Sequence, residues 1–367
     1  MKTRLILVGG FLGAGKTTML WEASRRLVER GLRVGLITND QAPELVDTAF
    51  LSRGDVKVAE VNGSCFCCNF QGLLDAMNQV RKAADADVII AEPVGSCTDL
   101  SATIVQPLKD RLRRELEVAP LSVMADPLRL SDILDGGTAG LHPSAAYIFR
   151  KQLEEADLVL ISKSDLLTSG ELQVLKSRLV QAYPGVEVSI VSAKTGDGID
   201  PWLDTVSKQS ESGRRIAEVD YDIYAEGEAV LGWLNATITL RGERTEWNTF
   251  AERLLSDLSQ RFDRMGASVG HVKLMLEDGD SFLIGNLTGK RDTISIRGSA
   301  GTGSSARLTI NARVQMSPEK LEEIVRDVIV STGNGQLTAT EVAWRCLSPG
   351  RPNPTHRYGQ VVALQGS

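Results

Sequence analysis

The stretch Gly10-Phe11-Leu12-Gly13-Ala14-Gly15-Lys16-Thr17-Thr18 decides the fold of this chain. It reads G-x-x-x-x-G-K-T directly behind the apolar run 5–8, the pattern of a P-loop between a strand and a helix. Backbone N–H groups of such a turn face phosphate oxygens. We therefore predict that a nucleoside triphosphate binds here, with Lys16 at its β- and γ-phosphates and the Thr17 hydroxyl as a Mg²⁺ ligand. The predicted phosphate contacts are Gly13, Ala14, Gly15, Lys16, Thr17 and Thr18.

The first part of the chain alternates short apolar runs with helical patterns, which is typical of a doubly wound α/β domain. A parallel sheet of this kind holds its ligand at the carboxyl ends of the strands. The runs that we predict as further strands are 32–38, 56–60, 88–91, 121–125, 158–161 and 186–191. The predicted helices are 16–30, 73–84, 101–116, 144–155 and 171–182.

A polar linker at 207–215 separates a second, smaller region with a different pattern. Its strands are predicted at 234–240, 269–276, 282–286, 293–297 and 306–314, and its helices at 247–264 and 317–330. Grouped strands with two helices predict an α+β domain, for which a ferredoxin-like fold is one candidate, and the glycine-rich stretch 298–305 is predicted as a loop. The predicted domains are therefore a P-loop domain over 1–212 and an α+β domain over 220–367.

Composition narrows the class of protein. The chain has 367 residues, 42% of them hydrophobic and 24% charged, with a net charge of −6, so nucleic-acid binding has no electrostatic support. The N-terminal apolar run is broken by glycines and has no convincing cleavage site, and no segment reaches membrane-spanning length. Five cysteines, three of them in one short window, suggest thiolate chemistry in a reducing compartment. We expect a cytoplasmic protein with no membrane partner, and we leave homodimerisation open.

Two further motifs belong to a nucleotide site. Glu92-Pro93-Val94-Gly95 follows an apolar strand, so Glu92 is predicted in the Mg²⁺ shell and Gly95 N–H at the γ-phosphate. The tetrapeptide Ser162-Lys163-Ser164-Asp165 stands where GTP-binding proteins carry N-K-x-D. There the Asp accepts hydrogen bonds from guanine and the Lys stem packs on the ring. With Ser192-Ala193-Lys194, these residues favour guanine over adenine.

A cysteine loop lies between these elements. Cys65, Cys67 and Cys68 can converge on one soft or borderline cation as thiolates. Packed, inert thiols or a redox pair at Cys67-Cys68 are the alternatives. Cys97 is a candidate for the fourth ligand, with a small buried side chain as its alternative.

Together these motifs resemble the CobW/HypB/UreG family of P-loop GTPases, and most closely its CobW-like branch, over residues 1–207. That branch combines a GGFLGAGKTT-type P-loop, a C-x-C-C loop, E-x-x-G, N-K-x-D and a smaller C-terminal domain. The resemblance implies a SIMIBI-class GTPase that acts as a metallochaperone or metalloenzyme activator for Zn²⁺, Co²⁺ or Ni²⁺. It also implies that Asp40 contacts Mg²⁺ or orients the attacking water; a solvated turn residue is the alternative. This chain departs from the branch at Ser162, which replaces Asn, and by one extra residue in the loop 62–68.

The resulting hypothesis is a slow GTPase that couples nucleotide state to metal transfer toward a client metalloprotein. GTP hydrolysis is expected to be slow because no arginine finger is evident in the switch regions. One rival is a nucleotide-regulated metal-binding protein without significant turnover. The other is a small-molecule P-loop kinase.

His142 and His271 are expected to be structural. Cys346 and His356 could hold metal or dock a client, but a surface coil is favoured.

Overall fold

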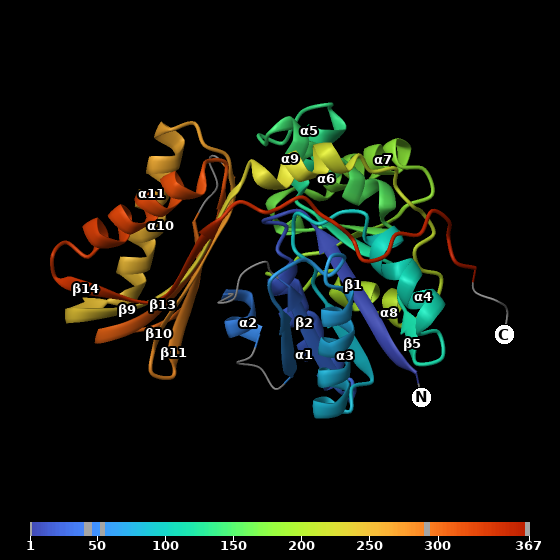
Figure 1. Cartoon of the computed structure of the whole chain (residues 1–367), viewed down its shortest axis with the longest axis horizontal. Helices are drawn as coiled ribbons and strands as arrows, with labels where there is room; N and C mark the ends of the chain where they lie inside the picture. Colours follow the sequence, from blue (N-terminus) through green and yellow to red (C-terminus); the bar gives the residue numbers. More distant parts are fainter. Residues whose placement is uncertain (1, 40–45, 52–55, 290–293, 364–367) are drawn as a thin grey trace.

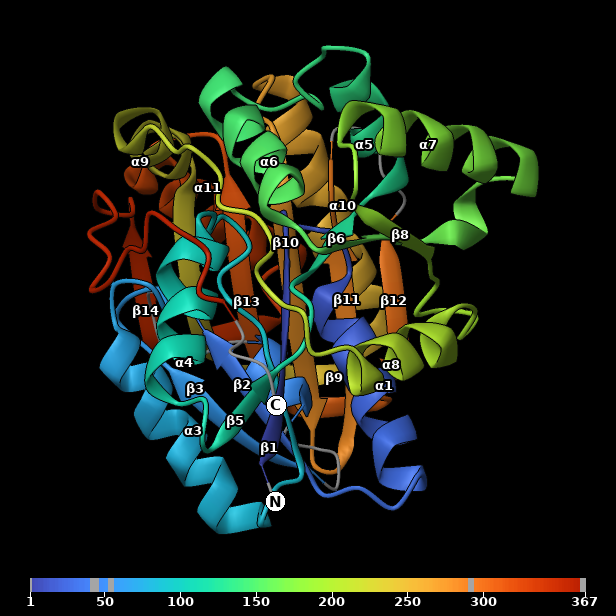
Figure 2. The same cartoon turned by 90° about the vertical axis from the view of Figure 1, so that its right-hand side faces the viewer.

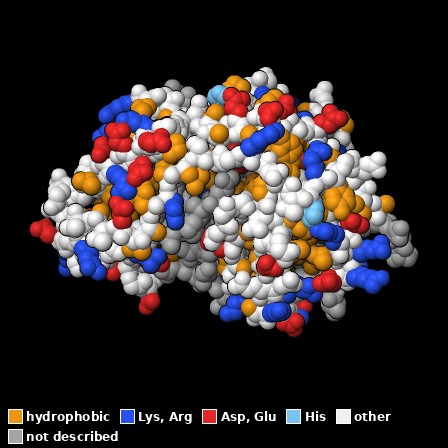
Figure 3. All heavy atoms as spheres, viewed as in Figure 1, with side chains coloured by type: hydrophobic (Ala, Val, Ile, Leu, Met, Phe, Trp, Pro, Cys, Tyr) orange, Lys and Arg blue, Asp and Glu red, His pale blue; other side chains and the backbone are white. Residues whose placement is uncertain are grey.

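The computed structural model describes residues 2–39, 46–51, 56–289 and 294–363, which form two sheets with separate cores. Figure 1 shows the two halves side by side, with the red C-terminal tail running back across the first half. In Figure 2 the first half faces the viewer and the second sheet lies behind it. On the face drawn in Figure 3, acidic and basic side chains are interspersed. No described helix combines the length and the apolar character that crossing a bilayer requires.

The first half is the predicted doubly wound domain. Its eight strands are all parallel, in the order β3-β2-β4-β1-β6-β7-β8, with β5 paired to β1. The strands are β1 (Thr3–Gly10), β2 (Val34–Asn39), β3 (Lys57–Val61), β4 (Val88–Ala91), β5 (Leu116–Val118), β6 (Ser122–Ala125), β7 (Leu158–Ile161) and β8 (Glu187–Ile190). The α-helices are α1 (Lys16–Glu29), α2 (Val46–Leu51), α3 (Phe70–Ala84), α4 (Gln106–Arg111), α5 (Pro127–Leu134), α6 (Pro143–Glu155), α7 (Ser169–Ala182) and α8 (Ile199–Lys208).

Both faces of this sheet are covered, which explains its continuous apolar strands. In β1, Leu5 and Leu7 enter one core while Ile6 and Val8 enter the core on the opposite face. Because the strands are parallel, the loops after β1, β3, β4, β7 and β8 leave the same edge of the sheet. The P-loop, the cysteine loop, Glu92–Gly95 and the two base-site motifs all begin in these loops.

The second half is an antiparallel sheet with two helices on one face. Its strands are β9 (Gly232–Glu246), β10 (Val269–Asp278), β11 (Ser281–Leu287), β12 (Ser295–Ser299), β13 (Thr302–Val314) and β14 (Leu337–Leu347), in the order β12-β11-β10-β13-β9-β14. The helices are α10 (Trp247–Arg264) and α11 (Pro318–Thr332). Strands β9, β10, β13 and β14 with their two helices follow the split β-α-β order of ferredoxin-like folds, and β11 and β12 are added at one edge.

Three of the predicted segments differ from the structure. The stretch 298–305 is not a loop, because β12 runs to Ser299 and β13 begins at Thr302. The pattern 101–116 is not one α-helix: a π-helical turn, η1 (Ser101–Val105), precedes α4, and β5 begins at Leu116. The linker is packed on the first domain, since Gly213 N and Arg214 N donate to the buried Asp157 carboxylate at 2.6 and 2.8 Å. Helix α9 (Tyr221–Ala229) follows it and packs against α6.

Candidate functional site

The P-loop adopts the predicted turn between β1 and α1. Gly15 has φ +90° and precedes the first residue of α1, a backbone conformation that glycine adopts without strain. The Lys16 ammonium lies under the turn and donates to the Gly10 carbonyl at 2.8 Å. Its Nζ also lies 3.8 Å from Glu92 Oε1. The loop after β1 and the loop after β4 therefore meet at this lysine.

The residues predicted around Mg²⁺ also lie together. The Thr17 hydroxyl donates to Glu92, 3.2 Å from Oε2. Gly95 lies close to Lys16, since a Cβ at Gly95 would be 3.0 Å from Lys16 Nζ. Hydroxyl and carboxylate oxygens are suitable Mg²⁺ ligands, so the residues present fit this ion. Asp40 lies outside the described residues.

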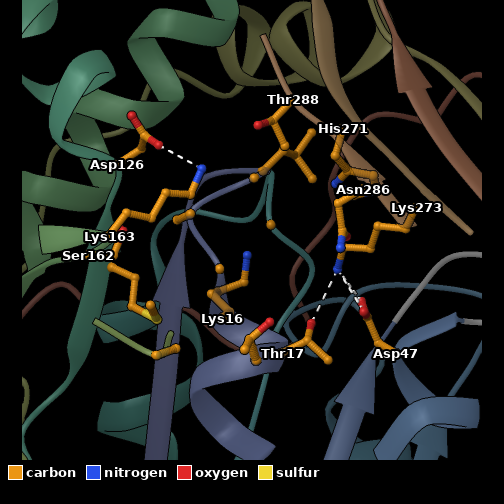
Figure 4. Close-up of a pocket in the computed structure, with 18 of the residues that line it drawn as sticks. Lys16, Thr17, Asp47, Asp126, Ser162, Lys163, His271, Lys273, Asn286 and Thr288 are labelled. Carbon is orange, nitrogen blue, oxygen red and sulfur yellow. Dashed lines mark hydrogen bonds and ion pairs between the residues drawn. The ribbon is translucent and has the colours of Figure 1, made fainter. Parts of the chain in front are cut away.

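A cavity of about 580 Å³ extends from the P-loop and is lined by both halves of the chain. In Figure 4, Lys273, His271, Asn286 and Thr288 of the second domain project toward the P-loop. Lys273 Nζ lies 3.2 Å from Thr17 Oγ1 and 2.6 Å from Asp47 Oδ2. This contribution was missed by sequence reasoning. The sequence did contain one signal for it. Polar and apolar side chains alternate in β10, where His271 and Lys273 stand between apolar residues.

The residues predicted to contact the base line the far end of the same cavity: Ser162, Lys163, Asp165, Ser192, Ala193 and Lys194. Asp165 accepts a hydrogen bond from Ser192 Oγ at 2.7 Å, and Lys194 Nζ lies 3.5 Å from its other oxygen. Burial raises the pKa of Asp165, but these partners outweigh it and hold the pKa below the usual value. The carboxylate is thus ionised and ready to accept. Ser162, in contrast, donates its hydroxyl to the Ala125 carbonyl at 3.1 Å.

Burial dominates the electrostatics of the phosphate end. Burial lowers the pKa of Lys16, which the Glu92 charge opposes and the Lys273 charge assists. Burial and the Asp47 charge raise the pKa of Glu92. The pKa of His271 is held well below its usual value by burial and by Lys273 and Arg313. His271 is therefore a neutral side chain. It was expected to be structural, and it lies in the wall of the cavity.

The three clustered thiols form the second part of the site. The Sγ atoms of Cys65, Cys67 and Cys68 all lie within 4.8 Å of one another, with Cys65 and Cys67 at 2.9 Å. The neighbouring thiols, Cys67 first, hold the pKa of Cys65 well below its usual value. Cys97 is buried and lies outside this group of three, so the structure gives it no place among the clustered ligand atoms.

Two segments connect the cysteine loop to the rest of the site. Asn39, at the end of β2, lines the nucleotide cavity and accepts from Phe66 N at 2.8 Å while donating to the Ser64 carbonyl at 2.8 Å. The segment 92–97 carries Glu92 at one end and Cys97 at the other. The segments at the ends of β2 and β4 therefore connect the phosphate end of the cavity with the cysteine loop.

The C-terminal tail covers the cysteine loop from outside. Asn353 N donates to Cys68 Sγ at 3.2 Å, and Thr355 N donates to the Cys67 carbonyl at 2.8 Å. His356 packs edge-on against Phe70, with ring centroids 5.1 Å apart. A surface coil was expected for Cys346 and His356, and this is right only for His356. His356 lies in coil, but Cys346 is a half-buried residue of β14 that donates to the Pro318 carbonyl at 3.0 Å.

Comparison with known proteins gives curated relatives and solved structures of similar sequence or fold. The chain is 26% identical over 227 residues to the zinc chaperone CobW of Pseudomonas aeruginosa, covering 53% of this chain and 58% of that one. It is 28% identical over 181 residues to the zinc chaperone YeiR of Escherichia coli, covering 47% and 50%. The matches thus span only about half the length of these relatives.

Among solved structures, the Zn(II)-bound YjiA GTPase from Escherichia coli matches with a TM-score of 0.35 and 15% identity, covering 90% of this chain and 99% of that one. The hydrogenase maturation factor HypB from Archaeoglobus fulgidus matches with a TM-score of 0.40 and 17% identity, covering 55% and 87%. The family model of the CobW/HypB/UreG nucleotide-binding domain matches residues 4–189, the part that carries the P-loop, the cysteine loop, Glu92–Gly95 and the base-site motif Ser162–Asp165. The chain belongs to the CobW/HypB/UreG family.

Proposed function

We propose that this protein binds and hydrolyses GTP and uses its nucleotide state to control transfer of a transition metal to a client metalloprotein. The observation that carries the proposal is the shared edge of the sheet. Asn39 lines the cavity and hydrogen-bonds to the backbone of the cysteine loop, and the segment 92–97 runs from Glu92 in the cavity to Cys97 beside Cys65. A change at the terminal phosphate can therefore reach the thiols through two short segments.

At the phosphate end, Lys16 neutralises charge on the transferring phosphoryl group, and the P-loop amides orient it. Thr17 and Glu92 would hold Mg²⁺, which supplies charge neutralisation at the β- and γ-phosphates when it is bound. Gly95 N–H is proposed at the γ-phosphate. Asp40 is proposed to orient the attacking water. Turnover is expected to be slow.

At the base end, Asp165 is proposed to select guanine. Its ionised carboxylate accepts from the ring N–H and the exocyclic amine of guanine, a pair of donors that adenine lacks. Lys163 precedes it in the αL conformation, with φ +49°, and its ammonium is paired with Asp126 Oδ2 at 2.9 Å. That ion pair holds the lysine stem along the cavity wall, where a purine ring can pack.

The transported metal is the substrate of the cysteine cluster. Cys65, Cys67 and Cys68 offer three sulfur ligands, which suit Zn²⁺ and also Co²⁺ or Ni²⁺. Zinc is favoured by the zinc-chaperone names of the relatives. Three ligands leave one coordination position, which Cys97 or an incoming group of the client can fill. Transfer of the metal requires that the ligand in this fourth position can be exchanged.

The test is a competitive chelator titration with zinc, using anaerobic wild-type protein and a triple Cys65→Ser, Cys67→Ser, Cys68→Ser variant. Each is measured with GDP and with a non-hydrolysable GTP analogue. We expect wild type to bind zinc with an affinity that depends on the nucleotide, and zinc to change analogue affinity by the same factor. Equal zinc affinity in wild type and triple variant would disprove the metal site.

Two rival functions give different outcomes. Nucleotide-dependent zinc binding with no measurable GTP hydrolysis would identify a nucleotide-regulated metal-binding protein. Phosphorylation of an added small-molecule acceptor would identify a kinase. We favour the GTPase because the base-end motifs lie in one cavity with the P-loop.

A further inference from the structure

Strand β10 presents a cation to the phosphate end of the nucleotide cavity. Side chains alternate along the strand. Val272 and Leu274 enter the core of the second domain, whereas His271 and Lys273 line the cavity (Figure 4). Lys273 lies on a strand paired on both sides, with β11 and β13. The position of its backbone is thus fixed by the sheet rather than by a loop.

The partners of Lys273 define where its ammonium lies. Nζ is 3.2 Å from Thr17 Oγ1 and 2.7 and 2.6 Å from the two oxygens of Asp47. Thr17 is the P-loop threonine, whose hydroxyl marks the position of the β- and γ-phosphates. The side chains of Lys273 and Asp47 are 17% and 16% exposed, so the ammonium lies within the site and not on its rim.

The second domain contacts helix α2 and the P-loop around this lysine. Val46 N donates to Asn311 Oδ1 at 2.8 Å, one residue before Asp47. At the P-loop, a Cβ on Gly13 would lie 2.9 Å from Thr288 Cγ2, so the two domains are in close contact there. Arg129 also joins them, donating to the Leu12 carbonyl at 2.8 Å and the Val269 carbonyl at 3.0 Å.

We propose that Lys273 is a ligand of the terminal phosphate of the bound nucleotide, supplied by the second domain of the same chain. The proposal rests on the proposed binding of GTP at the P-loop. A triphosphate brings a negative γ-phosphoryl group to the end of the cavity where Thr17 lies, and Lys273 can turn from Asp47 toward it. A diphosphate offers no such group, so Lys273 remains with Asp47. A cation at this position also stabilises charge that develops during phosphoryl transfer.

The test compares Lys273→Gln and Lys273→Arg with wild type and with Ser268→Ala as a control. Ser268 Oγ donates to the Gly140 carbonyl at 2.5 Å, so this control removes a contact between the domains that does not line the cavity. Affinities for GDP and for a non-hydrolysable GTP analogue are measured by titration calorimetry with Mg²⁺. Single-turnover GTP hydrolysis is measured in parallel.

We expect Lys273→Gln to weaken analogue binding at least tenfold, to change GDP binding less than threefold and to slow hydrolysis at least tenfold. Lys273→Arg should restore most of each loss, and Ser268→Ala should keep the wild-type ratio of the two affinities. Equal loss for both nucleotides, or no loss, would overturn the proposal and leave Lys273 as a contact between domains. If Lys273→Gln unfolds, the Lys273→Gln/Asp47→Asn double variant, which leaves no unpaired carboxylate, gives the same comparison. Failure of wild type to bind the analogue would instead disprove the proposed GTP site.

Discussion

The nucleotide cavity and the cysteine cluster lie at one edge of the same parallel sheet, but the second half of the chain covers them in different ways. The cavity is covered by a strand of a folded sheet, through Lys273 and its neighbours. The cysteine loop is covered by an extended tail, through backbone donors of Asn353 and Thr355. A packed sheet moves as a unit, whereas a tail can detach locally. The difference suggests that nucleotide binding involves the whole second domain and that metal exchange requires only the tail to open.

The largest effect should come from the P-loop lysine. Lys16→Ala removes the buried ammonium that faces the phosphates, so we expect GTP hydrolysis to fall at least about 100-fold, the scale of losing one pre-organised charge-stabilising group. Zinc binding to the cysteines should persist, which separates the two sites. The measurement is release of inorganic phosphate from GTP by wild type and Lys16→Ala. Lys82→Ala, at an exposed lysine of α3, is the control. Wild-type turnover in Lys16→Ala would show that the P-loop is not the hydrolytic site.

The second prediction concerns the segment after Cys97. Glu155 accepts from Thr98 Oγ1 at 3.0 Å and from Ser101 N at 2.8 Å, and burial raises its pKa to about 8. Its ordinary pKa is 4.5, so the native state retains a proton that the unfolded chain loses. This stability is fully present below about pH 4.5 and is lost as pH rises through about 8.

Glu155→Gln has no proton to lose. Between pH 6 and pH 9 we expect wild type to lose about 2.7 kcal/mol more unfolding free energy than this variant, since the difference spans about two pH units at about 1.36 kcal/mol each. Urea unfolding at the two pH values measures the difference. Parallel pH profiles of the two proteins would contradict the protonated state of Glu155.

The third prediction tests the base end of the cavity. We expect GTP to bind at least tenfold more tightly than ATP, about 1.4 kcal/mol, and Asp165→Asn to abolish or invert the preference. The reason is that an amide presents a donor where guanine also presents a donor. Titration calorimetry with both nucleotides provides the test, with Asp204→Asn on the surface of α8 as a control. Equal affinities in wild type would exclude guanine selection by Asp165.

The smallest effect is expected at the tail. Asn353→Pro removes the N–H that donates to Cys68 Sγ, whereas Asn353→Ala keeps it, and the side chain itself is exposed. Hydrogen bonds to a ligand atom strengthen its hold on the metal. We expect zinc to leave the proline variant about threefold faster, measured by transfer to a chromogenic chelator. Identical rates in the two variants would mean that the tail does not contribute through this hydrogen bond.

Local patterns predicted most of the first domain. Strand β7 and helix α10 have the predicted bounds, because an apolar run and an amphipathic period specify them without distant partners. The turn at 300–301 and strand β14 were missed. In β14 the side chains are mostly exposed, so its sequence shows no buried face, and it is stabilised by pairing with β9.

The candidate site was predictable only where it is built from motifs. Residues of the P-loop, the segment 92–95 and the base-end motifs all lie in one cavity, as their positions after parallel strands require. Lys273 and Asn353 were not predictable in this way. Their contacts with Thr17 and Cys68 span 256 and 285 residues, and no spacing rule connects such distant positions.

The distance between the cysteine loop and its cover has a consequence for biosynthesis. Cys68 leaves the ribosome 285 residues before Asn353, which at about 5–20 residues per second is roughly 15 to 60 s. Domains generally fold as units during synthesis, N-terminal first. The nascent first domain therefore holds its thiol cluster without the tail for that interval. Co-translational metal loading, or oxidation of the same thiols, has its widest opportunity before translation reaches the tail.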